Sequence, residues 1–174
     1  GQGAGLDGSS FVAMQQWVHD MDAFEATSGT ERDHIMGRNL QTNDELEDAP
    51  ESAHVKRTEQ ESFTPEAFVR RRSMPWALGQ KMGLMFVAFG HSLDAYEVQM
   101  RRMAGEEDGT IDHLFQISKP VTGSYLWCPP TQDGAPTLHQ LGLSTMSLPA
   151  PLHPRFALFP HLARWNFPAG WLLL

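Results

Sequence analysis

The chain has 174 residues, 41% of them hydrophobic, and a formal net charge of −8. This length favours one domain with a core, or one domain plus an appendage, over two full domains. The negative charge argues against nucleic-acid and anionic-membrane binding, since phosphates would be repelled over most of the molecule. No apolar stretch is long enough to span a bilayer. A single cysteine, Cys128, excludes an intramolecular disulfide and a cysteine-based zinc site. Together with the lack of a signal-peptide pattern, it predicts a cytoplasmic protein.

The composition changes after Asp133. All 21 acidic residues precede this point, and five prolines between positions 149 and 168 interrupt each apolar run that follows. We therefore expect one domain over residues 1–143 and a proline-rich tail over residues 144–174 that is disordered or extraneous. A docking peptide for a partner is the alternative interpretation of the tail.

In the first part of the domain, the sequence predicts a strand followed by helical turns. Residues 9–19 alternate with period two and have apolar residues on both faces, which is typical of a strand covered on both sides. Asp22 with Glu25, and Thr30 with Asp33, resemble capping boxes, so one helix or two short ones should follow and end at Gly37. Residues 39–64 are polar and acidic without a period, and this long loop contains His54.

The second part predicts three more strands and two helices. Ser92 precedes Leu93, Tyr96, Met100 and Met103 at helical spacing, and Ile111 to Phe115 suggests a short further helix. Strands are expected over residues 67–76, 83–90 and 123–128. The order β-α-β-β-α-β predicts an α+β, ferredoxin-like fold, with an antiparallel sheet and helices on one face.

Three consecutive arginines, Arg70 to Arg72, fall on a strand that should be half-buried. Burying such charges is costly unless an anion or a developing charge lies nearby, so this strand should face a ligand. Alternation places Arg71 and Ser73 on one side, and surface ion pairs explain Arg70 and Arg72. We expect the ligand on the sheet face opposite the helices.

Several short motifs occur in a fixed order. They are Gly8-Ser9-Ser10-Phe11, Ile35-Met36-Gly37-Arg38, Ser52-Ala53-His54, Arg71-Arg72-Ser73-Met74-Pro75-Trp76 and Val121-Thr122-Gly123-Ser124-Tyr125-Leu126-Trp127. Over about residues 8–143 this series resembles the C-terminal half of a dye-decolourising (DyP-type) haem peroxidase. The resemblance implies half of the two-unit, dimeric α/β-barrel-type DyP fold and a haem b cofactor.

The resemblance also implies roles for individual residues. His54 matches the proximal ligand of the haem iron, and Arg71 matches the distal arginine that holds peroxide. Ser73 stands where related enzymes often carry asparagine, so a hydroxyl would replace an amide. Asp112 matches a proximal aspartate that would accept a hydrogen bond from the imidazole, and a helix-start acid is its alternative interpretation.

Two further assignments concern the walls of the haem site. Arg38 is a candidate partner for a haem propionate, or else a cation at a helix C-terminus. Either Leu84, Phe86 and Ala88 or the alternate set Met85, Val87 and Phe89 should pack against the porphyrin, and strand parity alone leaves the choice open. The family's distal aspartate has no counterpart in its usual context. Asp7 imitates the motif but directly adjoins the first strand, so we interpret it as a turn residue.

These residues support three hypotheses. The first is a haem peroxidase, truncated and lacking the distal aspartate, that uses hydrogen peroxide to oxidise dyes, phenols or other small reductants. The second is a haem-binding module without turnover. The third is a cofactor-free ferredoxin-like interaction domain whose arginines bind an acidic partner. A half-protein of this kind should form a homo-oligomer or pair with a missing N-terminal half.

Overall fold

The computed structural model describes residues 7–143, so the expected tail over residues 144–174 lies outside the described part. Within that part, no helix is both long enough and apolar enough to cross a membrane. The longer elements are β1 (Ser10–His19), α1 (Met21–Ala26), α2 (Gly29–Met36), α3 (His54–Arg57), β2 (Arg70–Arg71), β3 (Met74–Leu78), β4 (Lys81–Gly90), α4 (Asp94–Met103) and β5 (Ser118–Cys128). The shorter ones are η1 (Gln60–Ser62), η2 (His113–Gln116), β6 (Thr131–Gln132), β7 (Ala135–Pro136) and η3 (His139–Leu141).

The main sheet is antiparallel and has the strand order β2-β4-β1-β5, with β3 also pairing with β4. The strand expected over residues 67–76 is divided into β2 and β3. Both keep one register along β4, since Arg71 pairs with Ala88 and Met74 with Met85. Counting them as one interrupted strand gives the expected β-α-β-β-α-β order, so the α+β, ferredoxin-like prediction is confirmed. Within the described residues the sheet is open, and no barrel closes.

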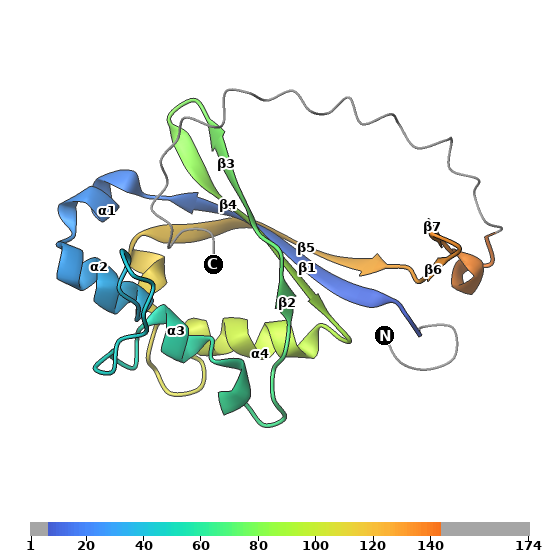
Figure 1. The fold of residues 1–174 in the computed structure, drawn as a ribbon, viewed down its shortest axis with the longest axis horizontal. Coiled ribbons are helices and arrows are strands. Elements are labelled where there is room, and N and C mark those ends of the chain that lie inside the picture. The colour runs from blue at the N-terminus through green and yellow to red at the C-terminus, as the bar shows by residue number, and fades with distance from the viewer. Residues whose placement is uncertain (1–6, 144–174) are drawn as a thin grey trace.

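The helices lie on one side of this sheet (Figure 1). Residues at alternate positions of β1 face them, because Ala13 and Trp17 are 1% and 5% exposed and pack against helical residues. The main core cluster consists of Trp17, Ile35, Leu84, Met103, Leu114 and Ile117. Trp17 also stacks on Phe115, with ring centroids 5.8 Å apart. The core therefore fills the layer between β1, β4 and the helical segments.

The helix starts differ from the predicted ones. Asp20 caps α1 by accepting the N–H of Ala23, and Ser28 caps α2 by accepting the N–H of Glu31. The expected capping residues, Asp22 and Thr30, lie in the first turns instead, two residues later. The predicted stop is confirmed, because Gly37 has φ of 78° and its N–H donates to the carbonyl of Asp33.

The predicted location of the ligand face is wrong. Arg71 pairs with Ala88, which is 2% exposed and packs in a cluster with Tyr96 of α4. Cross-strand partners share a face, so Arg71 points to the helix-covered side of the sheet. Both spaces that Arg71 lines also contain His54 of α3, and the smaller one contains Tyr96 of α4, so the site forms on this helix-covered face.

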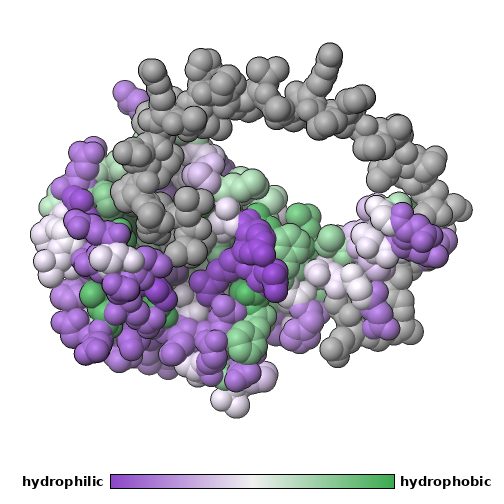
Figure 2. All heavy atoms as spheres, viewed as in Figure 1, coloured by the Kyte–Doolittle hydropathy of each residue, from purple (hydrophilic) through white to green (hydrophobic). Residues whose placement is uncertain are grey.

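The opposite face of the sheet carries apolar side chains and no described helix. Its rows follow from the register: Met74 pairs with Met85, and Val12 lies between Phe89 and Leu126. Met74 is 60% and Leu126 48% exposed. Figure 2 shows hydrophilic residues over α1, α2 and the segment that follows α2, whereas hydrophobic residues appear along the middle of the sheet.

Candidate functional site

The site begins with a histidine and an aspartate that are far apart in sequence. His54 is the first residue of α3, and Asp112 precedes η2. Nδ1 of His54 lies 2.7 Å from Oδ2 of Asp112, and the two side chains are 13% and 0% exposed. A carboxylate accepts hydrogen bonds, so Nδ1 carries the proton and Nε2 keeps its lone pair. A neutral imidazole of this kind is a metal or haem ligand.

Asp112 makes both of the contacts that the sequence left as alternatives. Its Oδ2 accepts from His54, while its Oδ1 accepts the N–H of Leu114 at 2.8 Å and caps η2. Each oxygen has one partner, so the cap holds the carboxylate in the orientation that meets the imidazole.

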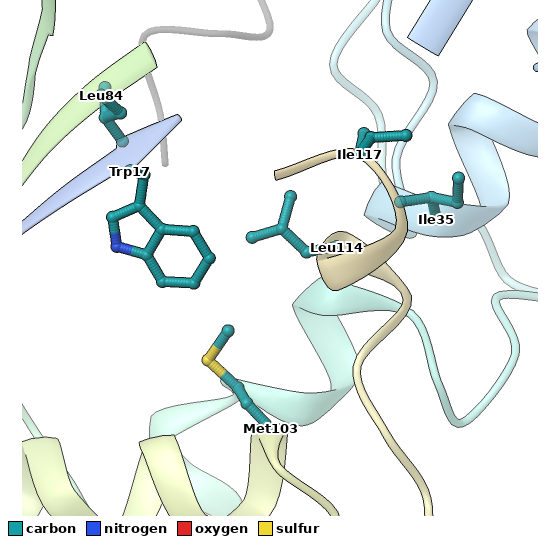
Figure 3. Packing of buried hydrophobic residues seen from close by; sticks show 6 residues of the cluster. All are labelled: Trp17, Ile35, Leu84, Met103, Leu114 and Ile117. Atoms are coloured by element: carbon teal, nitrogen blue, oxygen red, sulfur yellow. The ribbon is translucent and has the colours of Figure 1, made fainter. Parts of the chain in front are cut away.

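A cavity of about 510 Å³ opens in front of His54, and its lining includes Arg38, Glu45, Thr58 and Arg71. A second space of about 40 Å³ continues between the sheet and the helices. Its lining shares His54, Thr58 and Arg71 with the first and adds apolar residues, among them Trp17, Leu84, Phe86, Met103 and Leu114. Trp17, Met103 and Leu114 converge from three different elements on this layer (Figure 3). The site therefore has a polar mouth and an apolar inner part.

Arg71 is the most desolvated cation of this cavity. Burial lowers the pKa of its guanidinium, and the negative charge of Glu61 partly offsets that effect. One nitrogen donates to the carbonyl of Thr58 at 3.2 Å. A partly buried guanidinium whose hydrogen bond goes to a neutral carbonyl gains from an anion, which makes Arg71 the cavity's candidate anion-binding group.

Ser73 lies further along the same interrupted strand. The continuous register of β2 and β3 places it opposite Phe86, on the side of the sheet that Arg71 shares, as alternation predicted. Its Oγ is buried and has no hydrogen-bond partner among residues 7–143. Ser73 is not part of the lining of either space as the described residues form it.

Arg38 lies at the mouth of the larger cavity, directly after Gly37, the C-cap residue of α2. Its guanidinium donates to Oε2 of Glu45 at 3.1 Å and to the carbonyl of Asn43 at 3.2 Å. These contacts hold a positive group beside the opening, although the ion pair with Glu45 offsets part of its charge.

The register decides which residues of β4 face the site. Trp17 pairs with Leu84 and Ala13 with Ala88, so the set Leu84, Phe86 and Ala88 faces the helices. Phe86 and Leu84 line the smaller space. Phe86 also contacts Tyr96, with ring centroids 6.2 Å apart.

Sequence analysis missed several residues of the site. Thr58 lines both spaces and donates its hydroxyl to the carbonyl of His54 at 2.8 Å, a contact without any sequence signal. His19 lines the smaller space, and its Nδ1 lies 2.7 Å from Oγ of Ser118. Burial lowers the pKa of His19 to about 4. His19 lies two residues after Trp17 on the same strand, so the two side chains share a face, and this spacing could have identified His19 from the sequence.

Two further observations limit the chemistry of the described residues. Asp7 is exposed in a turn before β1, as expected of a turn residue. Residues 7–143 contain no cluster of three or more His, Cys, Asp or Glu side chains suited to a metal ion. What the larger cavity offers is the imidazole of His54, held by Asp112, together with the guanidinium groups of Arg38 and Arg71.

Comparisons with known proteins show the family to which the chain belongs. Residues 1–133 match the family described as "Dyp-type peroxidase, C-terminal". A dye-decolorizing peroxidase of Mycolicibacterium paratuberculosis is 30% identical over 128 residues, which cover 70% of this chain and 36% of the relative. The Mycobacterium tuberculosis protein of the same name is 29% identical over 148 residues, covering 80% and 44%.

Solved structures show the same similarity. A dye-decolorizing protein from V. cholerae has a TM-score of 0.66 at 29% identity, covering 73% of this chain and 43% of that one. A DypB variant from Rhodococcus jostii RHA1 in complex with heme has a TM-score of 0.64 at 28% identity, covering 70% and 41%. The chain thus spans less than half the length of these relatives. With the family match extending over most of its residues, the chain belongs to the DyP-type peroxidases, of which it represents the C-terminal part.

Proposed function

We propose that this chain is the haem-binding part of a DyP-type peroxidase that reduces hydrogen peroxide and oxidises a dye, a phenol or another one-electron donor. The observation that carries the proposal is the buried His54–Asp112 hydrogen bond at the wall of a cavity that Arg71 also lines. The relatives named above support the family, and one of the similar structures is described as a complex with heme.

The residues present fit haem b. The donor set is one imidazole whose Nδ1 is held by a carboxylate, which suits axial ligation through Nε2. The larger cavity has apolar lining from Met36, Val55 and Val69, which suits a porphyrin face, and Arg38 at its mouth suits a propionate. Phe86 lines the smaller space that shares His54 and Arg71 with this cavity. The larger cavity, about 510 Å³, lies within the range of cofactor sites, roughly 300–1,000 Å³.

When bound, haem would supply the redox chemistry of peroxide reduction. The chain's own residues would orient and stabilise the reactants. Asp112, by accepting the Nδ1 proton of His54, strengthens the imidazole as an electron donor. Arg71 would bind peroxide and stabilise the negative charge that develops on its oxygen as the O–O bond breaks. The buried hydroxyl of Ser73 lies on the same side of the sheet as Arg71, outside the lining of both spaces.

A specific observation favours the second candidate, a haem-binding module without turnover. Proton transfer from peroxide requires a base within hydrogen-bond reach, and Asp7 is instead exposed in the turn before β1. In this second reading, the chain binds haem through His54, and Asp7 does not serve as the carboxylate that moves the proton.

The apolar sheet face suggests how the chain associates. An exposed apolar patch of this kind marks an interaction surface in soluble proteins. We propose that it packs against a protein segment equivalent to the part of the DyP relatives that this chain does not span. A second copy of the chain is the competing occupant, and the oligomeric state of the isolated chain distinguishes the two.

Haem titration of purified protein, followed by a dye-oxidation assay with hydrogen peroxide, tests the proposal. We expect a Soret band in the parent and in His91→Ala, a control that removes an exposed histidine outside both spaces. His54→Ala should lose the histidine-ligated spectrum. A Soret band without dye oxidation would select the haem-binding module. Equal spectra for the parent and His54→Ala would reject the site.

A further inference from the structure

Two segments of the chain meet at the back of the site through several side-chain contacts. One segment contains α3 and the residues just before it, and the other joins α4 to η2. In order along the first segment, the contacts are Ser52 with His113, His54 with Asp112, and Arg57 with Asp108. The order is reversed along the second segment, so the segments run antiparallel and contact each other at three points.

Of the three contacts, the one between Arg57 and Asp108 has the most favourable hydrogen-bond geometry. The two terminal nitrogens of Arg57 donate to the two carboxylate oxygens of Asp108 at 2.8 and 2.9 Å, and one of them also donates to the carbonyl of Arg102 at 2.6 Å. The Arg57 side chain is 5% exposed. Bidentate pairing fixes orientation as well as distance. Hydrogen bonding to Arg57, followed by that to the N–H of Thr110, lowers the pKa of Asp108 to about 2, so the carboxylate stays charged at neutral pH.

The helix that carries His54 needs such a contact. α3 has four residues and no side-chain cap, and a single isolated turn is unstable because helix nucleation is unfavourable. Its orientation therefore depends on contacts with the rest of the protein. His54 and Arg57 are three residues apart, so they project from neighbouring positions on one side of the turn. Fixing Arg57 consequently fixes the rotation of the turn that aims the imidazole.

We infer that the Arg57–Asp108 pair is a positioning device that aligns Nδ1 of His54 with Asp112 and turns Nε2 toward the cavity. Arg57 contacts neither space directly. Its effect on haem ligation rests on the proposed function, whereas its effect on the His54–Asp112 hydrogen bond does not.

The Asp108→Asn variant tests this inference without haem. It is nearly isosteric at a half-exposed side chain and removes the charged acceptor of Arg57. The proton on Nδ1 of His54 is followed by NMR, and we expect its exchange with solvent to become at least about tenfold faster, because exchange reports local opening. Glu107→Gln is the matched control. It removes the same charge one residue earlier, from a carboxylate bound by Arg102.

A second measurement uses the haem-loaded protein. The iron–histidine stretching band of the ferrous form reports how strongly the imidazole donates. Weaker alignment with Asp112 should shift this band to lower frequency in Asp108→Asn and leave it unchanged in Glu107→Gln. Arg57→Lys keeps the charge but loses the bidentate geometry, so it should fall between the parent and Asp108→Asn. It also serves as the test variant should Asp108→Asn not fold.

Faster exchange of the His54 proton in Asp108→Asn or Arg57→Lys, with Glu107→Gln like the parent, supports the inference. Parent-like exchange in both test variants overturns it, as does an equal change in Glu107→Gln, which would indicate a general charge effect. Should the protein bind no haem, the proposed function fails, and the exchange measurement still decides the positioning role.

Discussion

Asp112 both stabilises η2 and orients the His54 imidazole, because its Oδ1 caps η2 and its Oδ2 accepts the imidazole proton. A substitution that keeps the first contact and removes the second can therefore separate them. Asparagine does this, because its amide oxygen still accepts the N–H of Leu114 while its amide nitrogen can only donate to His54.

In Asp112→Asn, the amide should favour the imidazole tautomer that has its proton on Nε2, which cannot ligate iron. We expect haem affinity to fall by roughly 10–100-fold, as for other residues that support a metal ligand. Absorbance titration measures this loss. Asp112→Ala should also lose the cap, at a further cost of about 1 kcal/mol in unfolding free energy. Parent-like haem affinity in Asp112→Asn would contradict the role of the carboxylate.

His19 predicts a pH dependence of stability. Its pKa is about 4 in the folded protein, against an ordinary value of 6.5 in the unfolded chain. The unfolded state therefore binds the proton first, and stability is lost as the pH falls from about 6.5 toward 4. Because His19 is partly exposed and solvent weakens the effect, the unfolding free energy should fall by about 2 kcal/mol or less.

Urea unfolding at pH 7 and pH 4.5 tests this expectation. In His19→Gln the difference in unfolding free energy between the two pH values should be smaller than in the parent, because the titrating imidazole is gone. His91→Gln, which changes an exposed histidine, should keep the parent's pH dependence. An unchanged pH dependence in His19→Gln would show that other groups cause the acid sensitivity.

Among the elements, α3 depends most on its surroundings. The sequence predicted a loop at His54, and the structure forms a single helical turn there that packs beside the end of α2. Gly37 makes this approach close. It adopts φ of 78°, and a Cβ at this position would collide with the side chain of Val55, the residue after His54.

Gly37→Ala should accordingly be more destabilising than its backbone conformation alone explains. The left-handed conformation costs about 1–2 kcal/mol for a residue with a Cβ, and the collision with Val55 adds about 1 kcal/mol or more. Gly79→Ala is the matched control, since Gly79 has φ of 60° and open space around its Cβ position. Urea unfolding compares the two. Equal losses would mean that Val55 moves aside freely and that α2 does not hold α3 in place.

At the scale of the whole molecule, the sheet has one face that helices cover and one apolar face that no described helix covers. The helix-covered face holds the site, and the other face exposes apolar side chains such as Met74 and Leu126. Cross-strand rows such as Val12 with Phe89 and Leu126 contribute apolar side chains to this surface, and the row of Gln16 with Thr122 contributes polar ones.

Leu126→Lys should reduce self-association of the isolated chain, because the charge makes burial of this row against another protein surface costly. Sedimentation velocity at several concentrations measures the effect. Phe68→Lys is the control, since Phe68 is 50% exposed but precedes β2 rather than lying on the sheet. Equal association in Leu126→Lys and the parent would place the interaction surface elsewhere.

Much of the element order was predictable because it depends on local backbone geometry. The alternation of β1, the stop at Gly37 and the shared side of Arg71 and Ser73 follow from periods of a few residues. The series of short motifs also predicted the family, which the comparisons show. The cytoplasmic location, argued from one cysteine and a missing signal pattern, stays a prediction, as do the roles of the individual site residues.

The sequence by itself determined which residues alternate and in what order the elements follow. Only the tertiary structure decided that Arg71 faces the helices, that Phe86 rather than Val87 lines the site, and that Asp112 bonds His54 across 58 positions. The physical reason is that a strand's period fixes two faces without saying which one is covered. That choice depends on where distant helices bury their apolar sides, and it is made by packing over the whole domain.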